Sequence, residues 1–401
     1  MGSIKKVNTE NVSEKIKESV DSIIKKSEFK NQEVEIRRID TNKGNFLGRL
    51  YEVNIKGLTD TGEKELNIFF KEELVLEKIK LVDVKEAYSK EIFIYKHFAK
   101  IANELQEKAK VPQSERYRFT KAYDETTEGL IILENLSKKG FKTYFKMDVM
   151  PIEYAEISIK NLARFHALSF AVENKMPNYF AKKIKNLSKP FNMDDDFHTF
   201  ITNICDSTAN FMLDEDDKQK LVKFKPVLKK KFSKYFVNEG KFKCCMNHGD
   251  YRLNNVLVRE EDRVPKEVMA VDYQLIDYGY ILRDFMFFIF TGTDREFRQK
   301  HLNNLKNVYF ETMKIFLGYF DLDIDDIYSR DTFEEEYKAM LDLGLMIGLY
   351  CSIFVFSAED SDFSLESKSL TELDVGNLDR RYAPRLKGLV DDFTEWGVLG
   401  I

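Results

Sequence analysis

The first third of the chain shows the apolar pattern of one helix followed by strands. Apolar residues recur at helical spacing over residues 12–26, which predicts an amphipathic helix. Apolar and charged residues then alternate with the two-residue period of half-buried strands. The strand-like segments are residues 34–36, 51–55, 66–70 and 129–133. Because Asp60-Thr61-Gly62 is a turn signal between two of them, the pattern predicts an antiparallel sheet, with a helix over residues 84–105 before its last strand.

From residue 137 onward, the apolar residues follow the period of helices instead. A long amphipathic helix is predicted over residues 152–172, and residues 194–237 are expected to form two or more helices. Two short strands are expected on either side of a charged loop at residues 259–267. The later predicted helices are residues 281–291, 294–317, 332–358 and 378–396.

These patterns predict an α+β fold in two lobes. We expect a small antiparallel-sheet lobe at residues 1–134, a hinge near residues 134–137 and a larger, mainly helical lobe at residues 135–401. The length of 401 residues agrees with this division, because it is long for a single small core. The net charge of −5 gives no general positive field, so nucleic acid is not an expected partner.

The cysteines and the apolar runs indicate a cytoplasmic protein that does not enter a membrane. Adjacent Cys244 and Cys245 do not suit an ordinary disulfide, and the four cysteines contain no CxxC metal spacing. The N-terminal residues lack the apolar core of a secretory signal. The longest uncharged run, residues 343–358, is shorter than the roughly 18 residues needed to span a bilayer, so we expect a buried helix there.

An acid, an amide and a second acid form the strongest chemical signal in the chain. His248-Gly249-Asp250 is followed by Asn255 and, after an apolar strand, by Asp272. This order matches the catalytic-loop and metal-binding elements of kinases. Asp250 would accept the proton of an attacking hydroxyl group, while Asn255 and Asp272 would hold Mg²⁺ against the phosphates of ATP. Each residue alone has a plainer explanation (a turn cap for Asp250, a strand-end carboxylate for Asp272), and only the combination favours phosphoryl transfer.

Two further residues are expected to support this constellation. His248 is expected to shape the loop, because Asp250 already serves as the base. Asp284 precedes the apolar run of residues 285–290. It is either a carboxylate that accepts backbone hydrogen bonds from the catalytic loop or the N-cap of a helix.

Candidate phosphate-binding residues lie in the first lobe. Gly44 and Gly48 precede a strand, where glycine lets backbone amides approach phosphates, although an ordinary hairpin turn explains them equally well. Lys71 ends the strand of residues 66–70 and is the candidate partner of the α- and β-phosphates. Glu91 on the following helix would hold this lysine in an ion pair, as happens in kinases.

These motifs resemble the kinase-like superfamily that includes aminoglycoside phosphotransferases and choline kinases. Within it, the chain is most similar to the ecdysteroid-kinase-like (CHK) family, which is abundant in insects. The resemblance covers roughly residues 35–360. The segments that carry it are residues 248–257, Val271-Asp272-Tyr273-Gln274, Leu133-Glu134-Asn135-Leu136 and Leu162-Ala163-Arg164-Phe165-His166-Ala167.

The resemblance implies a bilobal protein-kinase-like fold that binds ATP between its lobes. The adenine would lie against the backbone from Glu134 to Leu136. Asp250 would be the base, and a small-molecule hydroxyl substrate would receive the γ-phosphate. The same resemblance gives Asn255 and Asp272 as magnesium ligands.

Three positions depart from the pattern of that family. The family usually has Leu-Trp-Val or a similar run after the His-Gly-Asp motif, where this chain has Tyr251-Arg252-Leu253. It often has a serine at the position of Gly48. Asp277 stands where a basic residue is expected, which bears on substrate or phosphate contacts but not on the metal site.

The expected function is therefore that of an ATP- and Mg²⁺-dependent small-molecule kinase. The aromatic content of 13% favours a steroid-like (ecdysteroid) or other apolar alcohol, bound in a pocket lined from residues 194–237 and 332–358. Acidic stretches at residues 194–196 and 214–217 leave open a cationic acceptor of the choline or aminoglycoside type. A catalytically silent small-molecule-binding protein of the same fold is the alternative from a different class.

Overall fold

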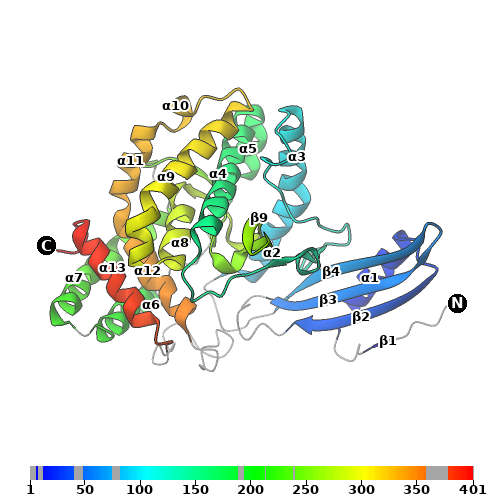
Figure 1. Ribbon diagram of the computed structural model, residues 1–401, viewed down its shortest axis with the longest axis horizontal. Coiled ribbons are helices and arrows are strands. Elements are labelled where there is room, and N and C mark those ends of the chain that lie inside the picture. The colour runs from blue at the N-terminus through cyan, green and yellow to red at the C-terminus, as the bar shows by residue number, and fades with distance from the viewer. Residues whose placement is uncertain are drawn as a thin grey trace.

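The computed structural model contains a strand-rich part and a helix-rich part. Figure 1 shows a twisted sheet that projects from a body of helices. The predicted α+β class is confirmed by this arrangement. The structure describes residues 6–7, 12–39, 48–74, 82–187, 194–212, 214–237, 240–357 and 378–400. Gly44 lies outside the described residues.

Five strands form the large sheet, in the order β1-β2-β3-β4-β5. Their bounds are β1 Lys6–Val7, β2 Asn31–Ile39, β3 Gly48–Thr59, β4 Gly62–Glu73 and β5 Leu130–Glu134. The strands from β2 to β5 pair antiparallel, as the alternating pattern predicts. Helix α1 (Glu14–Lys26) covers one face of the sheet, because Ile16, Val20 and Ile23 join the apolar cluster of the strands.

The helix predicted over residues 84–105 is present but changes its winding. It begins as α2 (Val84–Ile92), passes through the π-helical turn η1 (Phe93–Phe98) and continues as α3 (Ala99–Lys108). Such π-helical turns are rare and occur frequently at functional sites. Here the turn directly follows the end of α2, which carries Glu91.

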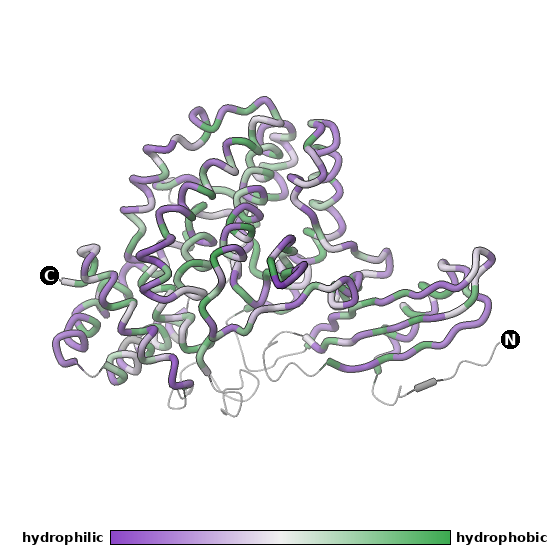
Figure 2. Tube along the Cα trace, in the orientation of Figure 1, coloured by the Kyte–Doolittle hydropathy of each residue, from purple (hydrophilic) through white to green (hydrophobic). Residues whose placement is uncertain are grey.

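The helical body has a single large core in which the central helices are buried on all sides. Helix α4 packs along α9, and α8 packs against α12. Figure 2 shows hydrophobic residues inside this body and hydrophilic residues on its outer helices. The helices are α4 Ile152–Lys175, α5 Pro177–Lys183, α6 Asp195–Asn210, α7 Glu215–Lys231, α8 Leu282–Gly292, α9 Arg295–Gly318, α10 Ile324–Ile327, α11 Arg330–Ala339, α12 Leu341–Phe356 and α13 Tyr382–Glu395.

Two small sheets lie within the helical body and carry the acid-amide-acid residues. Strand β7 (Cys244–Asn247) pairs with β10 (Asp277–Tyr280). Strands β6 (Phe141–Lys142), β8 (Val256–Glu261) and β9 (Val264–Ala270) form the other sheet.

The prediction of a charged loop over residues 259–267 is wrong. The strands β8 and β9 run on until only Asp262 and Arg263 separate them, with φ of 53° and 63°. Two successive positive φ values are those of a tight type I′ hairpin turn, which usually contains the glycine that this sequence lacks. The hairpin matters for function because Val256 pairs with Ala270, so Asn255 and Asp272 emerge at the same end of the ladder.

The single helix predicted over residues 332–358 is also wrong, because α11 and α12 meet at an angle of 54°. The prediction of a buried helix at its apolar end is confirmed, since nearly every residue of α12 is buried. Among the described residues, no single helix has both the length and the apolar character of a membrane span, although the bent α11–α12 pair together meets those two criteria.

Candidate active site

The loop that follows β7 depends on a glycine. Gly249 has φ of +83°, a conformation that residues with a side chain rarely adopt. A Cβ atom at this position would lie only 2.0 Å from the carbonyl oxygen of Leu275. The sharp turn therefore lets the segment of Asp250 pass directly over the chain that follows Asp272.

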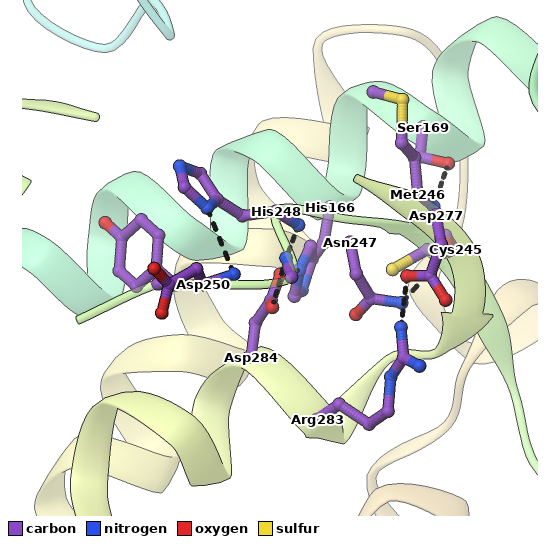
Figure 3. A network of polar contacts seen from close by, with 12 residues as sticks. His166, Ser169, Cys245, Met246, Asn247, His248, Asp250, Asp277, Arg283 and Asp284 are labelled. Carbon is purple, nitrogen blue, oxygen red and sulfur yellow. Dashed lines mark hydrogen bonds and ion pairs between the residues drawn. The ribbon is translucent and has the colours of Figure 1, made fainter. Parts of the chain in front are cut away.

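Asp284 holds this loop from below (Figure 3). Its carboxylate accepts the backbone N–H groups of His248 at 2.6 Å and Gly249 at 2.9 Å, and it contacts Nε2 of His166 at 3.1 Å. Burial alone would raise the pKa of Asp284, but the bonds to His166 and His248 outweigh burial and lower that pKa. These are the contacts that the predicted supporting role requires. The N-cap alternative is wrong, because the N-cap of α8 is Ile281.

The ring of His248 joins the loop to the strand that precedes Asp272. Its Nδ1 accepts the N–H of Asp250 at 3.4 Å, and its Nε2 lies 3.1 Å from the carbonyl oxygen of Val271. Burial lowers the pKa of His248, which favours a neutral ring with its proton on Nε2. A neutral ring that is bonded at both nitrogens makes the contacts that the predicted loop-shaping role requires, while the role of Asp250 as the base stays a prediction.

Asp250 and Asn255 are in direct contact. The amide nitrogen of Asn255 donates to Oδ2 of Asp250 at 2.8 Å and to the backbone oxygen of the same residue at 3.0 Å. The other oxygen, Oδ1, lies 2.8 Å from Nε of Arg252. Arg252 was noted in the sequence only as a departure from the family, and its place beside the candidate base was not anticipated. The pair fixes the direction of the carboxylate, and each oxygen keeps a further lone pair for another proton donor.

Asp272 completes the constellation from the neighbouring strand. Its own backbone has φ of +67°, and the N–H of Val271 donates to the backbone oxygen of Asn255 at 2.9 Å. The carboxylate lies 2.7 Å from Nζ of Lys71, and the same ammonium lies 2.8 Å from Glu91. The ion pair expected between Lys71 and Glu91 is therefore present, with Asp272 as a second partner.

Burial and charge act in opposition on these three groups. Burial would lower the pKa of Lys71, but the carboxylates of Asp272 and Glu91 outweigh it and raise that pKa. Burial would raise the pKa of Asp272, but Lys71 outweighs it and lowers that pKa. For Glu91 burial prevails, and its pKa is raised even though Lys71 is bonded to it. One ammonium thus pairs with two carboxylates. It outweighs the effect of burial on the pKa of Asp272 but not on the pKa of Glu91.

The oxygen atoms at this point suit a hard divalent cation. Among the described residues, no donor is bonded to the side-chain oxygen Oδ1 of Asn255 or to Oδ2 of Asp272. An amide oxygen and a carboxylate oxygen are ligands that Mg²⁺ accepts while it keeps several waters. The fit supports a magnesium site formed by these two residues, with Lys71 beside it for anionic ligands.

The segment that follows β5 borders a small apolar cluster. Leu136, Phe141 and Met269 are buried together, and the partly exposed Leu257 and Val271 pack against them. From the sequence, a binding role was assigned to Leu136 alone; Leu257 and Val271 entered only as parts of the family motifs, and the apolar character of Phe141 and Met269 gave no specific signal. The side chain of Glu134 accepts the N–H of Lys121 at 3.1 Å and pairs with Lys139. The roles given to Glu134 and Leu136 in nucleotide binding stay predictions.

Asp277 lies inside the helical body (Figure 3), with Arg283 as its ion-pair partner. Both side chains are buried, and the guanidinium of Arg283 lies 4.9 Å from the ring centre of Phe236. Burial raises the pKa of Asp277 in spite of this partner. A basic residue was expected at position 277. The structure has one six residues later, Arg283, whose buried pair with Asp277 joins β10 to α8.

The chain is similar to several solved structures. A putative aminoglycoside phosphotransferase from Ralstonia eutropha shares 12% identity over 94% of this chain and 98% of its own, with a TM-score of 0.41. The GDP complex of wild-type aminoglycoside 2′-phosphotransferase-IIIa shares 10% identity over 84% of this chain and 98% of its own, with a TM-score of 0.37. An ethanolamine kinase from Plasmodium vivax shares 11% identity over 78% of this chain and 80% of its own, with a TM-score of 0.36.

The assignment comes from the sequence family rather than from these structural similarities. No curated protein matches the chain. A model of the ecdysteroid kinase-like family matches residues 42–320, which is well over half of the chain. The protein therefore belongs to the ecdysteroid kinase-like family, a family of small-molecule phosphotransferases.

Proposed function

We propose that the protein transfers the γ-phosphate of ATP to a hydroxyl group of a small apolar alcohol, with steroid-like alcohols (ecdysteroids) as the first class to test, and that it requires Mg²⁺. The observation that supports this most strongly is the convergence of four side chains from separate elements. Asp250 contacts Asn255, the backbone of Asn255 is bonded to the strand of Asp272, and Asp272 contacts Lys71. Phosphoryl transfer needs this combination of a base, oxygen ligands and a fixed cation.

Each of these residues has a distinct task in the proposed reaction. Asn255 and Asp272 would hold the metal ion, which neutralises phosphate charge when it is bound. Lys71, fixed by Glu91, would bind the phosphates of the nucleotide. Asp250 orients the acceptor hydroxyl and takes its proton late in the transfer. The apolar surface of Leu257 and Val271 would face the adenine, next to the backbone of residues 134–136.

Aromatic residues gather around Tyr350 on α12. The phenol of Tyr350 on α12 is within electrostatic reach of the site, since its pKa is raised mainly by burial, further by the charge of Asp250, and lowered in part by Arg252. The rings that pack around Tyr350 come from α6, from the 3₁₀ turn η3 (Phe232–Phe236) and from α12, and they are Phe197, Phe200, Phe232 and Phe354. These rings are largely buried in the core of the helical body. We propose that the acceptor approaches Asp250 from the side of α12, and the aromatic character of this region supports an apolar alcohol.

The acidic stretches that left a cationic acceptor open have structural partners instead. Asp194 accepts the N–H of Phe197 at the start of α6. Asp214 accepts the N–H of Asp216 at 2.9 Å at the start of α7. Asp217 pairs with Lys220 at 3.0 Å. Because these carboxylates begin helices and balance lysines, we do not propose a choline-type or aminoglycoside-type acceptor.

The test compares wild type with Asp250→Asn on a panel of hydroxylated steroids, choline and aminoglycosides, with mass spectrometry to detect the gain of one phosphate group. We expect phosphorylated steroid with wild type and about 10²–10⁴-fold less with the variant, the usual contribution of a general base. Thermal stabilisation by Mg·ATP should be equal in both proteins, because Asp250 is not a proposed ligand of the nucleotide. Equal turnover by both proteins would remove Asp250 as the base. If wild type shows no turnover and no thermal stabilisation by Mg·ATP, the result would indicate a catalytically silent binding protein.

A further inference from the structure

Tyr88 is a buried residue of α2 whose hydroxyl group has no hydrogen-bond partner among the residues that the structure describes. Its side chain is only 1% exposed, and it lies one helical turn before Glu91. Buried hydroxyl groups are almost always bonded, because leaving a polar group without a partner is costly. An unmet hydroxyl that persists beside a candidate site is expected to have its partner in a ligand.

The hydroxyl of Tyr88 lies in a particular place, against the start of β3. A Cβ atom added to Gly48 would be 2.3 Å from this hydroxyl oxygen and 3.3 Å from Cγ of Lys71. Gly48 and Lys71 share a face of the sheet, because Leu50 lies two residues after Gly48 and pairs directly with Lys71. The absence of a side chain at Gly48 thus makes room for a hydroxyl group from the helix.

The electrostatic surroundings define what this hydroxyl can do. The ammonium of Lys71 lies 5.9 Å from the centre of the Tyr88 ring. Burial first, and then the charges of Glu91 and Asp272, raise the pKa of Tyr88 far above its ordinary value. The phenol therefore stays protonated and can act as a donor toward an anionic oxygen that Lys71 also binds.

We propose that Tyr88 donates its hydroxyl hydrogen to a phosphate oxygen of the nucleotide held by Lys71, and that Gly48 is required to let it do so. Tyr88 would then bind the nucleotide from helix α2, at a point where strand β3 has the side-chain-free residue Gly48. The assignment rests on the proposed function, because it needs a nucleotide at Lys71.

The first test is Tyr88→Phe, which keeps the ring beside Lys71 and removes only the oxygen. Calorimetry with Mg·ATP should show affinity weakened about tenfold or more, the usual effect of losing a hydrogen bond to a charged group. KM for ATP should rise by more than kcat falls, and the melting temperature should stay equal or increase. The matched control is Tyr337→Phe on α11, which also loses a buried hydroxyl that has no partner in the described part of the chain, and which should leave ATP affinity unchanged.

The second test moves the hydroxyl from the helix to the strand. Gly48→Ser alone should weaken ATP binding, because the new side chain would collide with Tyr88, whereas Gly48→Ser combined with Tyr88→Phe should restore affinity toward wild type. Unchanged affinity in Tyr88→Phe, or no restoration in the double variant, would overturn the assignment to Tyr88 while wild-type binding leaves the proposed function intact. If wild type binds no Mg·ATP, the proposed function and this assignment fall together.

Discussion

The two halves of the candidate site are held by different kinds of contact. In the loop of residues 248–255, the backbone itself is bonded, through Asp284 and through the neutral ring of His248. In the half that includes β4 and α2, the functional side chains hold one another, with Lys71 shared between Glu91 and Asp272. The loop is thus fixed by groups to which the proposed reaction gives no chemical role, whereas the lysine half is fixed by groups to which it gives one.

This difference predicts different responses to ligands and to substitution. Bonds from a buried carboxylate to backbone N–H groups need no rearrangement when substrates arrive, so the base Asp250 is preorganised. The Lys71–Asp272 contact, in contrast, joins two groups that the nucleotide and the metal ion would each require. We expect this contact to loosen on binding and Glu91 to keep the lysine in place. Substitutions in the loop half should therefore reduce stability, and those in the lysine half should reduce activity alone.

Replacing Asp284 with asparagine should have the largest effect on stability. The variant loses a buried charge that is bonded to His166 and to two N–H groups of the loop, and removing one partner of such a set costs about 3–5 kcal/mol. Urea unfolding at pH 7 would measure this loss.

The same variant has a defined pH dependence. Because the pKa of Asp284 is lowered in the folded protein, its stabilisation is present above the unfolded pKa of about 4 and disappears as the pH falls below that value. The difference in unfolding free energy between wild type and variant should therefore shrink below about pH 4. A difference that stayed constant down to pH 3 would show that the carboxylate does not act through its charge.

The sequence predicted the residues of the loop half because they lie close together along the chain. Asp250, Asn255 and Asp272 are separated only by a short loop and one hairpin, so their order along the chain nearly determines their neighbourhood. The Asp250–Arg252 contact is equally local, but no spacing rule distinguishes an arginine on the base from an arginine in solvent. The supporting role of Asp284 was predicted from its place before the apolar run of residues 285–290, and the structure places Asp284 in the first turn of α8.

The features that the sequence did not reveal depend on packing between distant elements. The position of Tyr88 against Gly48 depends on how α2 is oriented about its own axis. Sequence periodicity predicts only which face of the helix is buried. The turn at Asp262 and Arg263 carries two positive φ values without glycine, so turn chemistry gave no signal. The bend between α11 and α12 occurs at Met340, where neither proline nor glycine marks a break.

Gly249→Ala should reduce stability by a smaller amount, about 1–3 kcal/mol for the strained backbone together with the contact to Leu275. Gly397→Ala is the matched control, because Gly397 has a similar φ of +77° but open space around its Cβ position. The excess loss in thermal unfolding of Gly249→Ala over Gly397→Ala isolates the collision at the loop, and turnover should fall only in the former. Equal losses in both variants would show that the loop yields to the new methyl group.

Glu91→Gln should have the smallest effect on stability and a clear effect on turnover. Burial raises the pKa of Glu91, so the charge costs free energy that glutamine avoids, and Lys71 keeps Asp272 as a partner. The free energy of unfolding should change by less than about 1 kcal/mol, since replacing a buried ion-pair member by a neutral group that can still hydrogen-bond offsets much of the loss. Turnover should fall by roughly 10–100-fold because a lysine displaced from the phosphates is poorly oriented. Glu86→Gln on the exposed face of the same helix is the control and should change neither quantity. Glu91→Gln could instead lose as much stability as Asp284→Asn and keep its turnover. The ion pair would then serve the fold rather than the reaction, and the contrast between the two halves of the site would not hold.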